Sequence, residues 1–315
     1  MEIYDFAVIG AGGAGLAGAM YGARLGLKTV VFGVSNGAGL PIGGLITTAH
    51  IVDNYPGIRN ITGVEIAKKI EDHAKSYDLV TIKQEKVEDI SKSKNCFNIK
   101  TSKQKYQARA ILFATGRKLK KLGVKGAVKF EMKGVSYCAL CDAPLYRDKI
   151  VAVIGGGDAA VVEALILAEY VKKAYVIYRG DKINAELINL KKLKSNKKIE
   201  IITNTNIIEV DGKDHVTRII LDKPYKGKKV LEIDGVYVAI GSESISGLAK
   251  SLGIKLNSKK EIKIDHKTSK TNVPGVYAAG DAADKPFKQL ITGVAEGVTA
   301  AHSAYEYLSE KNLEC

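Results

Sequence analysis

The segments "DFAVIGAGGAG" (residues 5–15) and "IVAVIGGGDAA" (residues 150–160) share one design, an apolar run followed by a glycine-rich turn and small residues. The two turns read Gly10-x-Gly12-x-x-Gly15 and Gly155-x-Gly157-x-x-Ala160. In a dinucleotide-binding turn the first glycine permits a tight bend and the second lets a pyrophosphate approach the backbone. The third position must be small so that helix and strand can touch. Two such turns predict two nucleotide-binding folds in one chain.

Each turn continues as a strand–helix–strand unit should. A helix ending near "RLGL" and the strand "KTVVFG" (28–33) follow the first turn, and the helix "AAVVEALILAEYV" and the strand "KAYVIY" (173–178) follow the second. The strands are hydrophobic throughout, as in a parallel sheet that is buried on both faces. We therefore predict an α/β fold with two Rossmann-like domains.

The composition is that of an ordinary globular protein, and its charge excludes few partners. The 315 residues are 46% hydrophobic and 26% charged, and the net charge is +14. This length predicts about two domains. The run "KKLKSNKK" (191–198) is predicted to be a solvated helix face, and no nucleic-acid-binding motif lies beside it. Nucleic acid is therefore not an expected partner, whereas a basic surface favours acidic proteins.

Residues 6–23 carry no charge over the length of a membrane span. Six of these residues are glycine, and no basic segment precedes them as in a signal peptide. The phosphate-binding turn explains the glycines better than a membrane segment does. We expect a cytoplasmic protein without a membrane span.

The segment "VSYCALCDAPLY" (135–146) contains a Cys-x-x-Cys pair, Cys138 and Cys141, followed directly by Asp142. This spacing suits a metal knuckle, a structural disulfide or a redox couple. Cys96 and Cys315 are interpreted as solitary, the first as inert and the second as an incidental tail thiol rather than a redox relay. Such cysteine usage fits a reducing compartment, where a Cys-x-x-Cys is more often catalytic or metal-binding than structural.

Two further glycine-containing turns follow predicted strands. In "TNVPGVYAAGDAAD" (271–284) a short strand leads to Gly280-Asp281, and a helix rich in small residues is predicted at 288–308. Asp281 is placed either to bind a ribityl or ribose hydroxyl or to cap a helix. The strand in "ILFATGR" (111–117) also ends in a glycine-containing turn.

The order of these motifs resembles that of low-molecular-weight thioredoxin reductases, FAD-dependent pyridine nucleotide-disulfide oxidoreductases, over essentially the whole chain. "DNYPG" (53–57) also resembles a flavin-domain motif of that family. The resemblance implies a homodimer whose FAD-binding domain comprises residues 1–118 and 246–315. It implies an inserted NAD(P)H-binding domain, residues 119–245, that carries the cysteine pair and rotates between two positions.

The resemblance also implies individual cofactor contacts. The implied FAD contacts are Gly10, Gly12, Gly13, Ala14, Gly15, Ser35, Asn36, Gly44, Leu45, Asn54, Val87, Ala114, Thr115, Gly116, Gly280, Asp281, Lys288, Gln289 and Leu290. The implied NAD(P)H contacts are Gly155, Gly157, Asp158, Ala159, Ala160, Tyr178, Arg179 and Lys182.

In the family, the Cys-x-x-Cys is a redox couple that passes electrons to thioredoxin or a thioredoxin-like protein. The resemblance places Cys141 nearer the flavin and makes Asp142 the acid/base, although Asp142 could instead cap the following turn. A zinc site is disfavoured because it needs four ligands and the five histidines are scattered. A purely structural disulfide would gain little from so short a loop. A non-catalytic metal-binding module and a ferredoxin/NADP-type reductase, which needs no cysteine pair, are the less favoured alternatives.

Three departures from the family pattern concern the cofactors. No Asp or Glu lies between residues 25 and 52, so ribose recognition there falls to groups such as Ser35 and Asn36. In "YRGDKINAE" (178–186) only Arg179 remains of the family's basic cluster, with Lys182 as a partial substitute. "GSESISGL" (241–248) replaces a usual family segment. We predict NADPH as donor, with NADH possible and an acidic protein such as reduced ferredoxin as the alternative.

Overall fold

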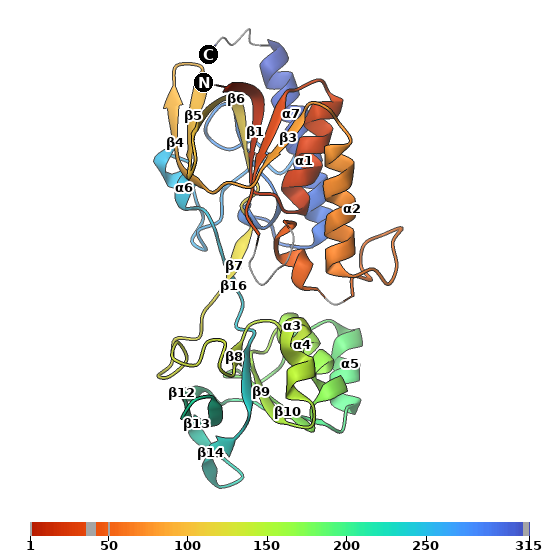
Figure 1. Cartoon of the computed structure of the whole chain (residues 1–315), viewed down its shortest axis with the longest axis vertical. Helices are drawn as coiled ribbons and strands as arrows, with labels where there is room; N and C mark the ends of the chain where they lie inside the picture. Colours follow the sequence, from red (N-terminus) through yellow and green to blue (C-terminus); the bar gives the residue numbers. More distant parts are fainter. Residues whose placement is uncertain (1, 36–41, 50, 311–314) are drawn as a thin grey trace. The chain divides into compact units, whose positions relative to one another are not determined.

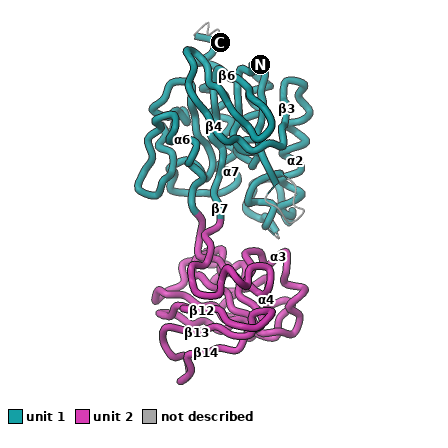
Figure 2. The backbone as a smooth tube through the Cα atoms, turned by 60° about the vertical axis from the view of Figure 1, so that its left-hand side comes forward, with its two compact units in different colours: residues 1–118, 243–315 teal, residues 119–242 magenta. Residues whose placement is uncertain are grey.

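The computed structural model describes residues 2–35, 42–49, 51–310 and 315. The chain divides into two compact units, unit 1 with residues 1–118 and 243–315 and unit 2 with residues 119–242 (Figure 2). From the sequence, the return to the first unit is expected at residue 246, whereas the structure has it at residue 243. The strands at the two crossings, β7 (Arg117–Leu119) and β16 (Ser242–Ser244), pair with each other. The cofactor assigned to each unit stays a prediction.

Among the described residues, unit 1 is built on a seven-stranded sheet. β1, β2, β3, β6 and β17 run parallel, whereas β4 and β5 are antiparallel to their neighbours. In spatial order the strands are β3 (Val80–Lys83), β2 (Thr29–Phe32), β1 (Glu2–Ile9), β6 (Lys105–Phe113), β5 (Cys96–Thr101) and β4 (Val87–Ser93), with β17 (Val276–Ala278) also paired to β6.

Both faces of this sheet are buried. Phe6 and Val8 of β1 pack into one apolar cluster, and their neighbours Ala7 and Ile9 pack into another on the opposite face. A strand buried on both faces has no reason to alternate with polar residues. Burial on both faces therefore explains why the apolar run at residues 6–9 is not interrupted by polar residues.

Three helices of unit 1 lie side by side (Figure 1), α1 (Gly13–Arg24), α2 (Gly63–Lys75) and α7 (Leu290–Glu310). α1 and α7 touch through glycine, because a Cβ at Gly297 would lie 2.0 Å from the carbonyl oxygen of Ala14. A short helix, α6 (Gly247–Ser251), and two 3-10 helices, η1 (Gly44–Thr48) and η3 (Gly280–Ala282), complete the unit. The small residues of the predicted C-terminal helix thus serve close packing.

Unit 2 contains a parallel sheet, an antiparallel sheet and three helices. The parallel sheet has the order β11 (Ile199–Ile202), β10 (Lys173–Ile177), β9 (Ile150–Ile154), β15 (Gly235–Val238) and β8 (Val135–Ser136). The antiparallel sheet has β12 (Ile207–Gly212), β13 (Val216–Tyr225) and β14 (Lys228–Glu232). The helices are α3 (Ala139–Asp142), α4 (Asp158–Tyr170) and α5 (Leu187–Ser195), and the 3-10 helix η2 (Ala143–Tyr146) follows α3.

The predicted α/β fold is confirmed, since each glycine turn joins a buried strand to a helix and the next strand is parallel to the first. The lysines of the run 191–198 are exposed, and α5 includes the first five residues of that run. The uncharged stretch 6–23 forms the second half of β1, the turn and most of α1. Among the described helices, none has both the length and the apolar character that a membrane crossing requires.

The interpretation of Cys96 and Cys315 as solitary thiols is wrong, because the two form a disulfide with a Cα–Cα distance of 5.3 Å. Cys96 is the buried first residue of β5, and its partner is 219 residues away in sequence. No spacing rule links cysteines so far apart, so only the tertiary fold reveals the pair. The disulfide also removes part of the ground for expecting a reducing compartment.

We expect Cys315→Ser to destabilise unit 1 in the oxidised protein. Opening a loop of this length releases chain entropy equivalent to about 5 kcal/mol at most. The melting temperature should therefore fall by up to about 10–20 °C in differential scanning calorimetry. Reductant should abolish the difference between wild type and variant. Equal melting temperatures without reductant would contradict the structural role of this disulfide.

Candidate active site

The Cys-x-x-Cys pair lies in unit 2 just after β8, with its sulfurs joined as a disulfide. Cys138 precedes α3, and its backbone N–H donates to Ser136 Oγ at 3.2 Å. The Cys141 N–H donates to Cys138 Sγ at 3.2 Å. Cys141 is exposed and Cys138 is half-buried. The pair thus follows the carboxyl end of a parallel strand, where ligand sites of α/β folds gather, and part of it is open to a partner.

Asp142 stands directly beside Cys141, and its carboxylate accepts no hydrogen bond from any described residue. In particular it does not cap η2, the turn that follows it. The capping alternative for Asp142 therefore has no support in the structure. A half-buried carboxylate without a structural hydrogen bond, adjacent in sequence to Cys141, is chemically able to serve as an acid/base.

Glu163 of α4 adjoins α3, the helix that carries Cys141, and is a residue of this site that the motifs of the sequence did not indicate. Its Oε2 accepts a hydrogen bond of 2.5 Å from the N–H of Ala139, the first residue of α3. Burial raises the pKa of Glu163 to about 7; the hydrogen bond opposes this rise and the charge of Asp142 adds to it. The available sequence signal was a single carboxylate among the apolar residues of "AAVVEALILA".

Two tyrosines lie close to these carboxylates. The rings of Tyr146 and Tyr237 meet edge to face at a centroid distance of 5.6 Å. The Tyr237 hydroxyl is buried and has no hydrogen-bond partner in the described part of the chain. Burial and the negative charge of Asp142 raise the pKa of both phenols, so they stay protonated at neutral pH. The two phenols therefore add no negative charge beside the Cys138–Cys141 disulfide.

In unit 1 the first glycine turn has the shape that its sequence predicts. Gly10 has φ 118°, and a Cβ there would lie 2.2 Å from the Ala114 carbonyl oxygen. A Cβ at Gly15 would lie 1.9 Å from the Gly10 oxygen. Gly12 precedes α1, and no described side chain caps that helix or places an acid in its first turn. Its first N–H groups can therefore bind a pyrophosphate.

Residues far apart in sequence gather around this turn. A Cβ at Gly13 would lie 2.4 Å from Leu290 Cδ1, one at Gly44 would lie 3.2 Å from Gly12 Cα, and one at Gly280 would lie 2.9 Å from Ala14 Cβ. The segment 114–116 follows β6 and adjoins the turn through Ala114. The structure thus brings together most of the glycine-containing segments implicated in FAD binding.

The other residues implicated in flavin binding differ in hydrogen bonding and in burial. Asn54 Nδ2 donates to Gln289 Oε1 at 3.1 Å, and Thr115 Oγ1 donates to the Ile245 carbonyl at 2.5 Å. The Asp281 carboxylate accepts no hydrogen bond from the described residues, so it is available to a ligand hydroxyl. Ser35 is exposed, Leu45 lies in η1, Val87 is buried in the core, and Asn36 lies outside the described residues.

An ion network that the sequence does not reveal supports the turn after β17. Glu296 pairs with the buried Lys285 at 2.6 Å and accepts the Gly280 N–H at 2.8 Å. Glu261 pairs with Arg117 at 2.8 Å and with Lys288 at 3.2 Å. Lys288 also donates to the carbonyls of residues 281 and 283. These pairs fix the backbone that presents Asp281.

The second glycine turn, in unit 2, repeats the backbone geometry of the first. Gly155 has φ 150°, and a Cβ there would lie 2.2 Å from the Ala239 oxygen. Ala160 is buried in the core, and Ala159 is exposed. Arg179 and Lys182 are exposed and form no ion pair with any described residue. Both cations remain available to a 2′-phosphate.

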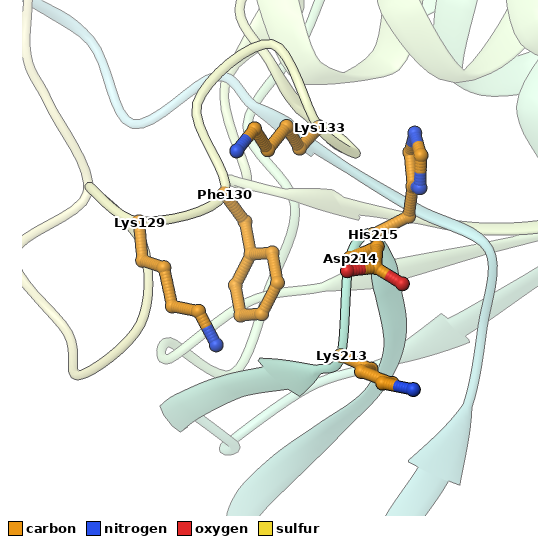
Figure 3. A pocket seen from close by; sticks show the side chains of 6 residues that line it. All are labelled: Lys129, Phe130, Lys133, Lys213, Asp214 and His215. Carbon is orange, nitrogen blue, oxygen red and sulfur yellow. The ribbon is translucent and has the colours of Figure 1, made fainter.

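A basic cavity of about 230 Å³ also lies in unit 2 (Figure 3). Lys129, Phe130 and Lys133 line one side, and the turn between β12 and β13 supplies the other. The second group comprises Lys213, Asp214 and His215. All of these side chains except Phe130 are exposed. No implied cofactor residue lines this cavity.

Comparison with known proteins gives one consistent result. Residues 4–304 match the family described as pyridine nucleotide-disulphide oxidoreductase. The thioredoxin reductase of Mycolicibacterium smegmatis is 34% identical over 98% of both chains. The thioredoxin reductase of Lactococcus lactis has a TM-score of 0.90 at 31% identity, over 98% of this chain and 100% of the other. A ferredoxin-flavin thioredoxin reductase from Clostridium acetobutylicum has a TM-score of 0.53 at 35% identity, over 99% and 100%.

The raised pKa of Glu163 predicts a pH-dependent stability. Between its ordinary value of 4.5 and about 7 the folded chain holds a proton that the unfolded chain releases. The free energy of unfolding should therefore fall as pH rises through this window. Glu163→Gln keeps an oxygen for the Ala139 N–H but cannot ionise. We expect the wild-type melting temperature to drop a few degrees more than that of the variant between pH 5 and pH 8; parallel curves would contradict the assignment.

Proposed function

This chain belongs to the thioredoxin reductase family of pyridine nucleotide-disulphide oxidoreductases, and from that premise we propose that it reduces the disulfide of thioredoxin or a thioredoxin-like protein. The observation that carries the proposal is the partly exposed Cys138–Cys141 disulfide, which stands beside the unbonded carboxylate of Asp142. In this proposal unit 1 binds FAD and unit 2 binds the nicotinamide nucleotide. Homodimer formation and a cytoplasmic location belong to the same proposal and rest on family likeness alone.

The residues of unit 1 fit FAD. The first N–H groups of α1 are uncapped by described side chains and suit the pyrophosphate. Asp281 offers a carboxylate that accepts no hydrogen bond from the described residues and suits a ribityl hydroxyl, and the ion network holds its backbone in place. When bound, FAD supplies the electron pair that opens the Cys138–Cys141 disulfide.

The chain's own residues manage the protons and the thiol exchange. Opening the disulfide yields two sulfurs that together need up to two protons, and we assign the proton exchange with Cys141 to Asp142, its neighbour in sequence. One thiolate then attacks a sulfur of the partner's disulfide, so that a mixed disulfide forms and a partner thiolate leaves. The second cysteine attacks the mixed disulfide. This step releases the partner as a dithiol and restores the Cys138–Cys141 bond.

We favour NADPH over NADH as the electron donor. Tyr178 stands at the end of β10, where an NADH-binding fold usually places an acid for the ribose 2′-hydroxyl. Arg179 and Lys182 are exposed cations suited to a 2′-phosphate. A reduced ferredoxin or another acidic protein is the second candidate. It is supported by the likeness to the ferredoxin-flavin thioredoxin reductase and by the net charge of +14.

Cys141→Ser should abolish thioredoxin reduction and leave flavin reduction by the donor largely intact, since only the acceptor couple is lost. Both can be followed in the purified holoenzyme, thioredoxin by its thiols and the flavin by its visible absorption. Cys315→Ser leaves the Cys138–Cys141 pair intact and is the control; measured well below its lowered melting temperature, it should keep wild-type turnover. Unchanged turnover in Cys141→Ser, or a protein that cannot be loaded with FAD, would refute the proposal.

Anaerobic titration identifies the donor. We expect NADPH to bleach the flavin absorption at a lower concentration than NADH, because only the former carries a phosphate for Arg179 and Lys182. Bleaching by reduced ferredoxin, with neither nucleotide effective, would replace NADPH by a protein donor. Equal effects of the two nucleotides would refute the role of the two cations.

A further inference from the structure

Glu163 of α4 holds the short segment that joins the two cysteines of unit 2. Its Oε2 accepts the N–H of Ala139 at 2.5 Å, and Ala139 is the fully buried residue directly after Cys138. Covalent geometry then places this carboxylate oxygen within roughly 8 Å of the Cys138 sulfur. Charges at such a separation shift each other's pKa by on the order of one unit. Glu163 can therefore act on the cysteine pair in two ways, through a fixed contact and through its charge.

Two neighbours affect a negative charge at the Cys138 sulfur in opposite directions. The Cys141 N–H donates to this sulfur at 3.2 Å, and a donor in this position favours a thiolate. The carboxylate of Glu163 disfavours the same thiolate whenever it is itself ionised, because like charges repel. The charge of Glu163 thus works against the stabilisation that the N–H provides.

The groups around Glu163 leave its charge uncompensated. Asp142 of α3 adds a second negative charge, and Tyr237 of β15 is a phenol that stays protonated at neutral pH. Tyr146 of η2, which also packs on α4, contacts the Tyr237 ring and stays protonated too. β9 is uncharged, Lys173 of β10 forms an ion pair with a glutamate of β11, and the lysines of α5 are exposed. Among the described residues no cation forms an ion pair with Glu163.

We infer that Glu163 is a positioning residue of the cysteine pair, which fixes the segment after Cys138 through the Ala139 N–H and controls by its charge how readily the opened pair forms a thiolate. The inference rests on the proposed function only in taking the pair as redox-active. In the ionised state Glu163 opposes a thiolate, and in the protonated state it does not. Because burial raises the pKa of Glu163 to about 7, the change between the two states falls near neutral pH.

Opening the disulfide breaks the S–S bond and consumes two electrons, which the reduced flavin supplies in the proposed function. When Glu163 starts ionised, two protons can go to the two sulfurs, which gives a dithiol and leaves Glu163 ionised. Alternatively, one proton goes to a sulfur and one to Glu163, which leaves one thiolate. The second distribution avoids two negative charges close together and keeps the nucleophile that attacks the partner's disulfide. Glu163 thus accepts a proton in place of the attacking sulfur.

Alkylation measures thiolate formation. The FAD-loaded enzyme is reduced with dithiothreitol, freed of it without oxygen and treated with iodoacetamide between pH 5.5 and pH 9, and mass spectrometry gives the rate at each cysteine. Glu163→Gln keeps an acceptor oxygen for the Ala139 N–H and removes the charge. At pH 7.5 we expect Cys138 to react about threefold faster in this variant than in wild type, because a thiol pKa lower by about one unit gives about tenfold more thiolate of lower intrinsic reactivity. The difference should close toward pH 5.5, where the wild-type carboxyl is protonated.

The matched control is Glu169→Gln, because Glu169 is an exposed glutamate of the same helix, and this variant should react like wild type. Visible flavin absorption and the melting temperature show whether each variant is folded. Wild type alone gives a second measurement that needs no variant. Its Cys138 rate should rise less steeply than about tenfold per pH unit between pH 6 and pH 8, because Glu163 ionises in the same range. A wild-type profile with a single pKa would contradict the inference.

Three results with the variants would also overturn it. Wild type and Glu163→Gln could have the same pH profile, Glu169→Gln could gain as much, or the gain could be constant at every pH, as altered packing would produce. Thioredoxin reduction by the dithionite-reduced enzyme is measured in parallel. If that reduction fails while the alkylation rates shift as expected, the proposed function falls and the inference stands. If thioredoxin is reduced while the alkylation profiles coincide, only the inference falls.

Discussion

The close approach of two backbone segments at each glycine turn is the constraint on which both units depend. A Cβ at Gly10 or at Gly155 would lie 2.2 Å from a carbonyl oxygen at the end of the neighbouring strand, in one unit at Ala114 and in the other at Ala239. Only glycine fits at such a distance with a positive φ. This close contact fixes where the first strand of each unit ends and where the following helix begins. It therefore also fixes where the first N–H groups of that helix are presented. The architecture of both units is arranged around it.

Features encoded by neighbouring residues could be predicted from the sequence. The apolar runs, the two turns and the Cys-x-x-Cys pair are local patterns, and the structure has a strand, a turn or a disulfide at each of them. Features that join distant residues could not be predicted. The Cys96–Cys315 disulfide, the contact of Glu163 with Ala139 and the ion pairs of Glu261 and Glu296 all depend on tertiary packing. Charged residues in the sequence are usually solvated, so no pattern distinguishes these from surface groups.

Two carboxylates near the disulfide, those of Asp142 and Glu163, differ in hydrogen bonding and in the effect of burial. Asp142 is half-buried and accepts no hydrogen bond from the described residues, so it can exchange a proton with a neighbour. Glu163 accepts the Ala139 N–H, and burial raises its pKa to about 7. A group that titrates near neutral pH responds to charge created nearby. In the proposed function, opening the disulfide creates negative charge, and the hydrogen bond from α3 connects Glu163 directly to the helix that carries Cys141.

A glycine motif alone does not specify which ligand a turn binds, as the two turns of this chain illustrate. The motif specifies a bend, a close contact and a helix start, and both turns have all three. The side chains that border the glycines differ between the two turns. The first turn is bordered by Leu290 and by the backbone of Gly44 and Gly280, and the second by Asp158 and Tyr178. The same backbone design therefore presents different side chains in the two units, with no acidic residue in the first turn of α1 and Asp158 in that of α4.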